Sequence, residues 1–266
     1  MQKFSYIFKD AEDQKEYERL KKIEELFDPR TQSLLQRIGL RQGMSFLELG
    51  PGAGGILGWV LEAVGSNGKV TAIDRDTRFI DKLQHPNLQI IKGDLTRIEL
   101  GNERYDFIHG RYVLMHIPGF QDVLKKVTAA LKPGGWILLE EADFTAARID
   151  TSIAENQRVF TATSQAIDRL FSSKKINPAF GKHLRETLVR CGFMNIQEEV
   201  YAPLDHGGRG TAEIMRLSAL QLWNQYLEAK AVNESDLQAY IKLADDPNQA
   251  AIYYATVSVW GQKFVV

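Results

Sequence analysis

A glycine-rich turn offers the first chemistry in this sequence. Residues Phe46–Gly55 read FLELGPGAGG, an apolar run followed by a cluster of glycines. Glycines let a ligand approach the backbone closely, and the helix predicted from Ile56 onward would point its N-terminus at that ligand. Gly50, Gly52 and Gly55 also satisfy the dinucleotide fingerprint. The loop alone therefore predicts a nucleotide-like cofactor without saying which one.

A carboxylate closes the next apolar run. Asp74 ends the segment VTAID, where its two oxygens could accept both hydroxyls of a ribose. Such a carboxylate could bind the ribose of any adenosine cofactor. Three further features distinguish one adenosine cofactor from another: Glu48, two residues before Gly50, the segment KGDL at Lys92–Leu95, and LKPGGW at Leu131–Trp136.

With these motifs in this order, the stretch from Glu48 to Glu141 resembles the class I S-adenosylmethionine-dependent methyltransferases. The resemblance implies a Rossmann-like α/β fold with a mostly parallel seven-stranded sheet, an antiparallel last strand, a helical cap and helical insertions. It implies S-adenosyl-L-methionine as the cofactor. Segments such as Tyr105–His116 and Cys191–Phe193 are similar to microbial small-molecule methyltransferases of the secondary-metabolite or quinone type.

The resemblance also implies a set of cofactor-binding residues in the glycine turn and at strand ends, namely Glu48, Gly50, Gly52, Gly54, Asp74, Arg75, Asp94, Leu95, Gly110 and Arg111. The three glycines would pass beneath the methionine part, with Glu48 supporting its amino end. Asp74 would hold the ribose, and Arg75 would lie beside the adenine. Asp94 would accept the adenine amino group, and the backbone of Leu95 would contact a ring nitrogen. Gly110 and Arg111 would line the cavity near the sulfonium.

The acceptor side is predicted with less detail. We expect Tyr6 to fold over the cofactor from the N-terminal segment, and Tyr112, His116 and Glu141 to line an apolar substrate pocket. Glu140 and Glu141 end the same strand, so alternation turns only one of them toward the pocket. No residue is assigned as catalytic, because a sulfonium donor is already activated and the protein chiefly positions the reactants.

The elements that must position these residues alternate in type. Short apolar strands are predicted at Ser45–Leu49, Lys69–Ile73, Leu88–Ile91, Tyr105–His109 and Trp136–Leu139, with helical patterns between most of them. This alternation predicts a parallel sheet that is buried on both faces and binds ligands at the carboxyl ends of its strands. Later strands are predicted near Ile196–Tyr201 and at Ile252–Trp260.

Helices are predicted on both sides of this alternating region. Before it, one amphipathic helix is expected over Ala11–Phe27 and a second, capped by Asp28 and Pro29, to about Ile38. After it, helices are expected at Thr151–Phe171, Pro178–Cys191, Thr211–Ala231 and Ser235–Ala244, the last capped by Asn233. The predicted organisation is an N-terminal helical cap (1–41), a cofactor-binding core (42–145), a helical insertion (146–192) and C-terminal core strands (193–266) with a helical insertion at 205–249.

Composition excludes several classes of protein. The chain has 266 residues, with 33 Lys and Arg against 34 Asp and Glu and no long block of one charge, so no nucleic-acid partner is predicted. No run is apolar enough for a membrane span or a secretory signal, and Cys191 is the single cysteine, so a cytoplasmic location is expected. The five histidines lack metal-ligand spacing, so no metal site is predicted.

Three functions were compatible with these residues. The leading one is methyl transfer to a small, partly apolar acceptor by a monomer or homodimer. An NAD-dependent oxidoreductase is permitted by the glycine pattern, although no Tyr-x-x-x-Lys pair follows the fourth strand. A non-catalytic S-adenosylmethionine-binding protein is the third.

Overall fold

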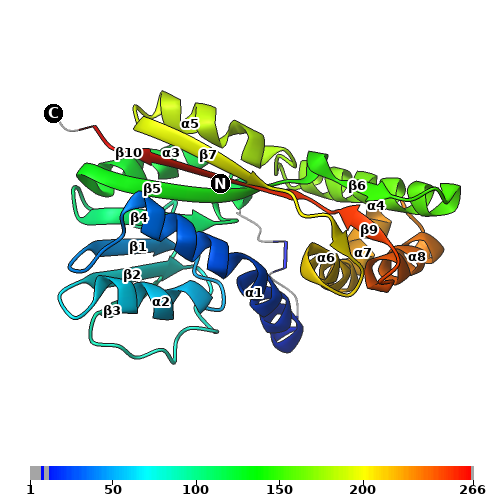
Figure 1. Ribbon diagram of the computed structural model, residues 1–266, viewed down its shortest axis with the longest axis horizontal. Coiled ribbons are helices and arrows are strands. Elements are labelled where there is room, and N and C mark those ends of the chain that lie inside the picture. Colours follow the sequence, from blue (N-terminus) through cyan, green and yellow to red (C-terminus); the bar gives the residue numbers. More distant parts are fainter. Residues whose placement is uncertain (1–6, 9–11, 265–266) are drawn as a thin grey trace. The chain divides into compact units, whose positions relative to one another are not determined.

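The computed structural model describes residues 7–8 and 12–264 (Figure 1). The chain forms two compact units. One contains the described residues of the segments Phe27–Glu141, Lys182–Glu199 and Val257–Val266, and we call it the sheet unit. The other contains the described residues of the segments Met1–Leu26, Ala142–Gly181 and Val200–Thr256, and we call it the helical unit.

A seven-stranded sheet in the order β3-β2-β1-β4-β5-β10-β7 organises the sheet unit (Figure 1). Its strands are β1 (Ser45–Leu49), β2 (Lys69–Asp74), β3 (Leu88–Lys92), β4 (Tyr105–Arg111), β5 (Leu131–Asp143), β7 (Met194–Tyr201) and β10 (Ala255–Gln262). The pairs β1–β2, β1–β4, β2–β3 and β4–β5 are parallel. The predicted fold class is confirmed, and each predicted strand of this parallel part falls within an observed one.

The last strand runs against the others. The backbone N–H of Lys263 donates to the carbonyl of Gly135 at 2.8 Å near the beginning of β5, whereas the Ser258 hydroxyl donates to Glu140 near its end. Rising residue numbers on β10 therefore meet falling numbers on β5, which defines the predicted antiparallel strand.

Helices pack on this sheet because its strands are apolar on both sides. α2 (Gly55–Val64), α3 (Phe120–Ala130) and α5 (Leu184–Arg190) belong to the sheet unit, together with the part of α1 (Asp13–Ile38) from Phe27 onward. α1 and α2 share one core cluster with alternate strand residues, which include Phe46, Ala72, Phe107, Leu138 and Trp260. We call this side of the sheet the α1 face. By strand alternation, Glu48, His109, Arg111, Glu140 and Ser258 lie on the same face.

The helical unit combines helices with a small antiparallel sheet. It contains α4 (Ala154–Ser173), α6 (Gly210–Gln221), α7 (Trp223–Glu228) and α8 (Glu234–Asp245). The sheet has the order β6-β9-β8 and consists of β6 (Arg148–Asp150), β8 (Asp205–His206) and β9 (Ala250–Ile252). Asn233 caps α8 through a complete capping box with Asp236, which confirms the predicted cap.

The prediction of two N-terminal helices is wrong. α1 is one continuous helix of 26 residues with Pro29 inside it. The predicted capping residue, Asp28, instead forms an ion pair with Arg111 on β4, and Thr31 one turn later is completely buried against the sheet. These tertiary contacts hold the turn helical despite the hydrogen bond that proline cannot donate.

The final strand also differs from its prediction. Tyr253 and Tyr254 are not part of a strand, so the predicted strand Ile252–Trp260 is divided between β9 and β10. These two strands belong to different sheets, whereas their continuous apolar sequence gives no sign of the division. The single helix predicted at Thr211–Ala231 is likewise divided into α6 and α7.

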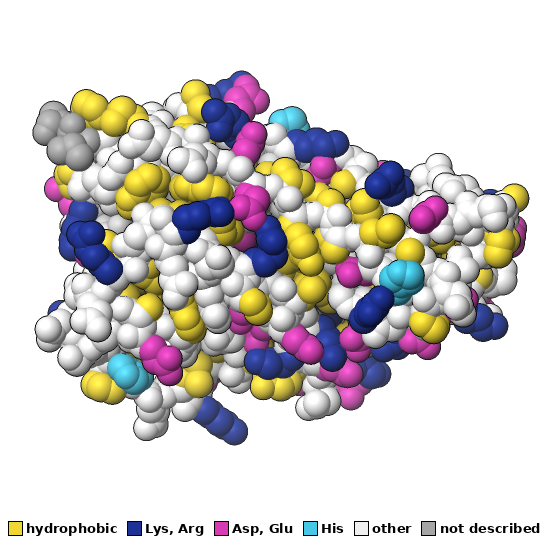
Figure 2. Space-filling view, viewed as in Figure 1, with side chains coloured by type: hydrophobic (Ala, Val, Ile, Leu, Met, Phe, Trp, Pro, Cys, Tyr) yellow, Lys and Arg dark blue, Asp and Glu magenta, His cyan; other side chains and the backbone are white. Residues whose placement is uncertain are grey.

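On the face shown in Figure 2, side chains of Lys and Arg are interspersed with those of Asp and Glu. This mixture agrees with the balanced composition of the chain. No helix among residues 7–8 and 12–264 is long and apolar enough to cross a membrane. The domain boundaries predicted from the sequence stay a prediction.

Candidate cofactor site

The glycine turn connects β1 to α2 as its sequence predicts. Gly50, Gly52 and Gly54 all have positive φ angles, of 64°, 61° and 87°. A side chain at Gly50 would collide with Val113, because a Cβ there would lie 2.4 Å from Val113 Cγ2. The backbone of Gly50 is fixed by a 2.9 Å hydrogen bond to the carbonyl of Ile73 on β2. Glycine is thus required at this position for both conformation and space.

Asp74 touches this turn from the end of β2. Its carboxylate accepts the backbone N–H groups of Asp76, at 3.0 Å, and of Gly52. Burial raises the pKa of Asp74 to about 6, and these backbone hydrogen bonds oppose the rise. A half-buried carboxylate and a run of left-handed glycines therefore meet at the carboxyl edge of the sheet, where open α/β sheets bind ligands.

Asp94 follows the neighbouring strand, β3. Its Oδ1 accepts the backbone N–H of Thr96 at 2.9 Å and the Thr96 hydroxyl at 2.7 Å. Burial would raise the pKa of Asp94, but these hydrogen bonds outweigh it and lower the pKa below its usual range. Arg75 lies 3.8 Å from the other oxygen, and Leu95 is buried. The structure thus brings Arg75 and Asp94 together at adjacent strand ends.

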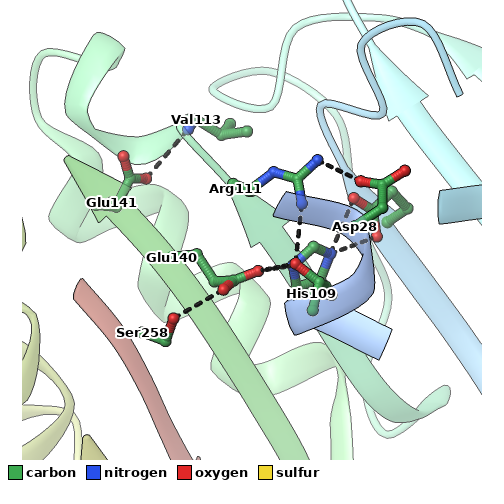
Figure 3. A network of polar contacts seen from close by, with 9 residues as sticks. Asp28, His109, Arg111, Val113, Glu140, Glu141 and Ser258 are labelled. Carbon is green, nitrogen blue, oxygen red and sulfur yellow. Dashed lines mark hydrogen bonds and ion pairs between the residues drawn. The ribbon is translucent and has the colours of Figure 1, made fainter. Parts of the chain in front are cut away.

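A buried histidine between two carboxylates occupies the α1 face (Figure 3). The Nδ1 atom of His109 lies 3.0 and 2.8 Å from the two oxygens of Glu48, and its Nε2 atom lies 3.1 Å from Glu140. Burial alone would lower the pKa of His109, but the two carboxylates outweigh it and raise this pKa to about 9. Burial would raise the pKa of Glu140, but His109 and Arg111 outweigh it and lower this pKa to about 2. His109 is therefore a cation paired with Glu140 at neutral pH.

The same network reaches α1. Arg111, at the end of β4, donates to Asp28 at 2.6 Å and to the Thr31 hydroxyl at 2.8 Å (Figure 3). Thr31 in turn donates to Glu140 at 2.5 Å. The ring of Phe27 packs edge-on against Tyr112, with 5.7 Å between the ring centroids. One turn of α1 is thereby fixed to the ends of β4 and β5.

Sequence reasoning missed most of this network. The sequence predicts no role for Asp28 beyond capping, and it assigns none to His109, Thr31 or Ser258. One signal was available, because parallel pairing of the first and fourth strands puts Glu48 opposite His109.

The other predicted site residues are placed as follows. Gly110 lies opposite Leu49, and a Cβ there would be 3.1 Å from the Leu49 Cβ. Tyr112 and His116 are half-buried in the segment after β4, whereas Glu141 is completely buried on the side of the sheet opposite Glu140. Tyr6 lies outside the described residues. No group of three or more His, Cys, Asp or Glu residues in the described part of the chain is arranged to hold a metal ion.

This strand order, with a glycine turn after β1 and an acidic residue at the end of β2, defines a Rossmann-like α/β domain. A family model described as a methyltransferase domain matches residues 20–197, and the chain belongs to this family.

Curated relatives and solved structures agree with this assignment. The chain is 28% identical over 123 residues to a sterol 24-C-methyltransferase of Aspergillus fumigatus, covering 41% of this chain and 32% of that protein. It is 26% identical over 113 residues to a demethylmenaquinone methyltransferase of Staphylococcus aureus, covering 41% and 47%. The chain thus spans between a third and a half of the length of these two relatives.

A solved structure shows the same fold over most of the chain. It is phosphoethanolamine N-methyltransferase 2 of Haemonchus contortus in complex with phosphomonomethylethanolamine and S-adenosylhomocysteine. The TM-score is 0.61 with 17% identity, covering 98% of this chain and 61% of that chain.

Proposed function

We propose that this protein transfers a methyl group from S-adenosyl-L-methionine to a small, partly apolar organic acceptor. The observation that carries the proposal is the contact between the Asp74 carboxylate and the glycine turn at Gly52. This contact supports the proposal because a carboxylate that could accept ribose hydroxyls then lies beside the glycine turn at the carboxyl edge of the sheet, in a chain of the methyltransferase family.

The residues present fit an adenosine cofactor. Asp74 offers carboxylate oxygens to ribose hydroxyls, while Asp94, with Arg75 and Leu95 beside it, offers an acceptor at the adenine end. Gly50, Gly52 and Gly54, together with the last two residues of β4, Gly110 and Arg111, would surround the methionine end. The role of Tyr6, which lies outside the described residues, stays a prediction. Glu48 at the amino end is part of the same proposal, although both its oxygens face His109.

When bound, the cofactor supplies a methyl group activated by its sulfonium. The products would be the methylated acceptor, S-adenosylhomocysteine and any proton that the acceptor atom carried. The chain's part is to hold the reacting atoms in line and to exclude water, which can contribute roughly 7–11 kcal/mol to lowering the barrier. No single side chain has to perform the chemistry.

The acceptor class rests on the relatives. The names of the matched proteins specify a sterol and a demethylated menaquinone, both largely apolar molecules. Tyr112 and His116, half-buried after β4, are the proposed acceptor contacts from the sheet unit.

Calorimetric titration with S-adenosylmethionine, S-adenosylhomocysteine and NAD tests the cofactor. We expect the first two to bind and NAD not to bind, since membership of the methyltransferase family does not favour the oxidoreductase alternative. Asp74→Ala should weaken S-adenosylhomocysteine binding by roughly 10–150-fold, because it removes charge-assisted hydrogen bonds of about 1.5–3 kcal/mol. Asp81→Ala, which removes an exposed aspartate nearby, is the matched control.

A methyl-transfer screen over quinones, sterols and other small phenols and amines separates an enzyme from a non-catalytic binding protein. Transfer of a labelled methyl group to at least one acceptor class supports the proposal. Tight binding of S-adenosylmethionine without transfer to any of them would favour the non-catalytic alternative.

A further inference from the structure

Glu141 is a buried acid on the side of the sheet opposite the His109 network. Its Oε1 atom accepts the backbone N–H of Val113 at 3.1 Å (Figure 3). The same atom accepts the N–H of Leu114 at 2.7 Å, and the N–H of Met115 donates to the same carboxyl group. The side chain is completely buried. One acid therefore satisfies the N–H groups of three successive residues.

Val113, Leu114 and Met115 belong to the turn that follows β4, which we call the Val113 turn. Tyr112 has a left-handed backbone with φ of 57°, and its N–H donates to the carbonyl of Glu140 at 2.8 Å. The short 3₁₀ helix Leu114–His116 then begins, and Val113 at its N-cap provides no side-chain cap. The first N–H groups of a helical turn have no partner within the helix, so Glu141 supplies the partner that the turn itself lacks.

The Val113 turn packs against the glycine loop. Val113 lies against Gly50 so closely that a Cβ at Gly50 would be 2.4 Å from Val113 Cγ2. Gly50 is the first of the three left-handed glycines between β1 and α2. A chain of contacts therefore runs from Glu141 through the Val113 turn to the loop that is proposed to hold the cofactor.

We propose that Glu141 is a positioning residue for the cofactor, which fixes the Val113 turn against Gly50 and so sets the position of the glycine loop. The inference rests on the proposed function of that loop. It gives Glu141 a task other than the contact with substrate expected from the sequence.

The two oxygens of Glu141 differ in their contacts, which allows a conservative variant to test the proposal. Oε2 is buried and has no hydrogen-bond partner among the described residues. Burial raises the pKa of Glu141 to about 8, so the group holds its proton at neutral pH. A glutamine would keep the accepting Oε1 atom and replace only the oxygen that has no partner.

The experiment measures S-adenosylhomocysteine affinity by calorimetry at 10 °C, with folding checked by circular dichroism. Glu141→Ala should weaken binding by at least tenfold, because the turn loses its acceptor and Val113 is released from Gly50. Glu141→Gln should recover most of that loss, and removal of the exposed Glu99 by Glu99→Ala should have no effect. Equal loss in the alanine and glutamine variants, or full affinity in a folded Glu141→Ala protein, would overturn the proposal.

A double-mutant cycle tests the route. Val113→Ala should weaken binding on its own, and combined with Glu141→Ala it should add less than twofold to the loss, because both act on the same contact with Gly50. If the losses of affinity in the two single variants multiply in the double variant, Glu141 does not act through Val113. Unchanged affinity in Val113→Ala would also contradict the proposal, and this single variant can be measured even if Glu141→Ala does not fold. A wild-type protein that binds no S-adenosylhomocysteine would instead contradict the proposed function.

Discussion

The imidazole of His109 lies 2.8 Å from a carboxylate oxygen of Glu48, and both side chains are buried at neighbouring positions of β4 and β1. Because Glu48 stands two residues before Gly50, this pair ties the beginning of the glycine turn to the strand that ends in Arg111. Both Glu48 oxygens are directed at His109, so its direct contact with the cofactor stays a prediction. The structure gives Glu48 a second task, which is to hold a buried cation inside the sheet unit.

Removal of His109 should be strongly destabilising. His109→Ala leaves Glu48 and Glu140 buried without their shared cation, and breaking a buried ion pair from one side costs about 3–5 kcal/mol of unfolding free energy. Urea unfolding at pH 7 measures this loss, with the exposed His85→Ala as the control. A loss below about 1 kcal/mol would show that His109 is neutral in the folded protein.

The stability of the protein should depend on pH with a defined sign. The pKa of His109 is raised from 6.5 to about 9, so its contribution is full below pH 6.5 and is lost as the pH rises through 9. The pKa of Glu141 is raised from 4.5 to about 8, which also lowers stability as the pH rises through 8. The pKa of Glu140 is lowered from 4.5 to about 2, so its contribution disappears as the pH falls toward 2.

The three groups together predict greatest stability in mildly acidic solution, at roughly pH 5, with a decline toward pH 9. Urea unfolding across this range checks the profile. Glu141→Gln should flatten the decline between pH 5 and 8, because it removes one group that must lose its proton there. A wild-type protein that becomes more stable from pH 6.5 to 9 would contradict the assigned pKa shifts.

Cofactor affinity should fall in acid because of Asp74. Burial raises its pKa to about 6, and protonation removes an acceptor oxygen from the ribose hydroxyls. S-adenosylhomocysteine binding should therefore be constant from pH 7 to 8 and weaken by up to roughly tenfold for each pH unit below 6. Calorimetry at several pH values tests this, and Asp74→Asn should bind more weakly with little change between pH 5 and 7. An unchanged slope in that variant would assign the titration to another group.

The ion pair between Arg111 and Asp28 should anchor α1. Both side chains are only about a tenth exposed, so Asp28→Ala leaves a buried guanidinium without its partner and should cost about 3–5 kcal/mol. Amide hydrogen exchange should rise in Phe27–Ile38, the part of α1 that belongs to the sheet unit. Glu186→Ala, which breaks the exposed pair with Arg190, should leave unfolding unchanged and serves as the control. Equal changes in unfolding free energy for the two substitutions would show that the buried ion pair stabilises the protein no more than the exposed one.

Features that depend on local patterns could be predicted from the amino-acid sequence. The run Ser45–Leu49 was predicted with its observed bounds, because an apolar segment ended by glycines has few alternatives to a buried strand. The glycine turn and the position of Asp74 at a strand end could be predicted as well. Each depends on the residue type at single positions, because left-handed backbone favours glycine and Asp74 directly follows an apolar run.

The pairing of the buried charged groups depends on the tertiary structure. Asp28 looks like a helix cap in the sequence, yet α1 continues past it because Arg111, 83 positions later, takes its carboxylate. Glu140 and Glu141 are neighbours, but strand alternation sends one to His109 and the other to the Val113 turn. Local periodicity cannot encode such partners, because they depend on the register between strands and on the helix that packs over them.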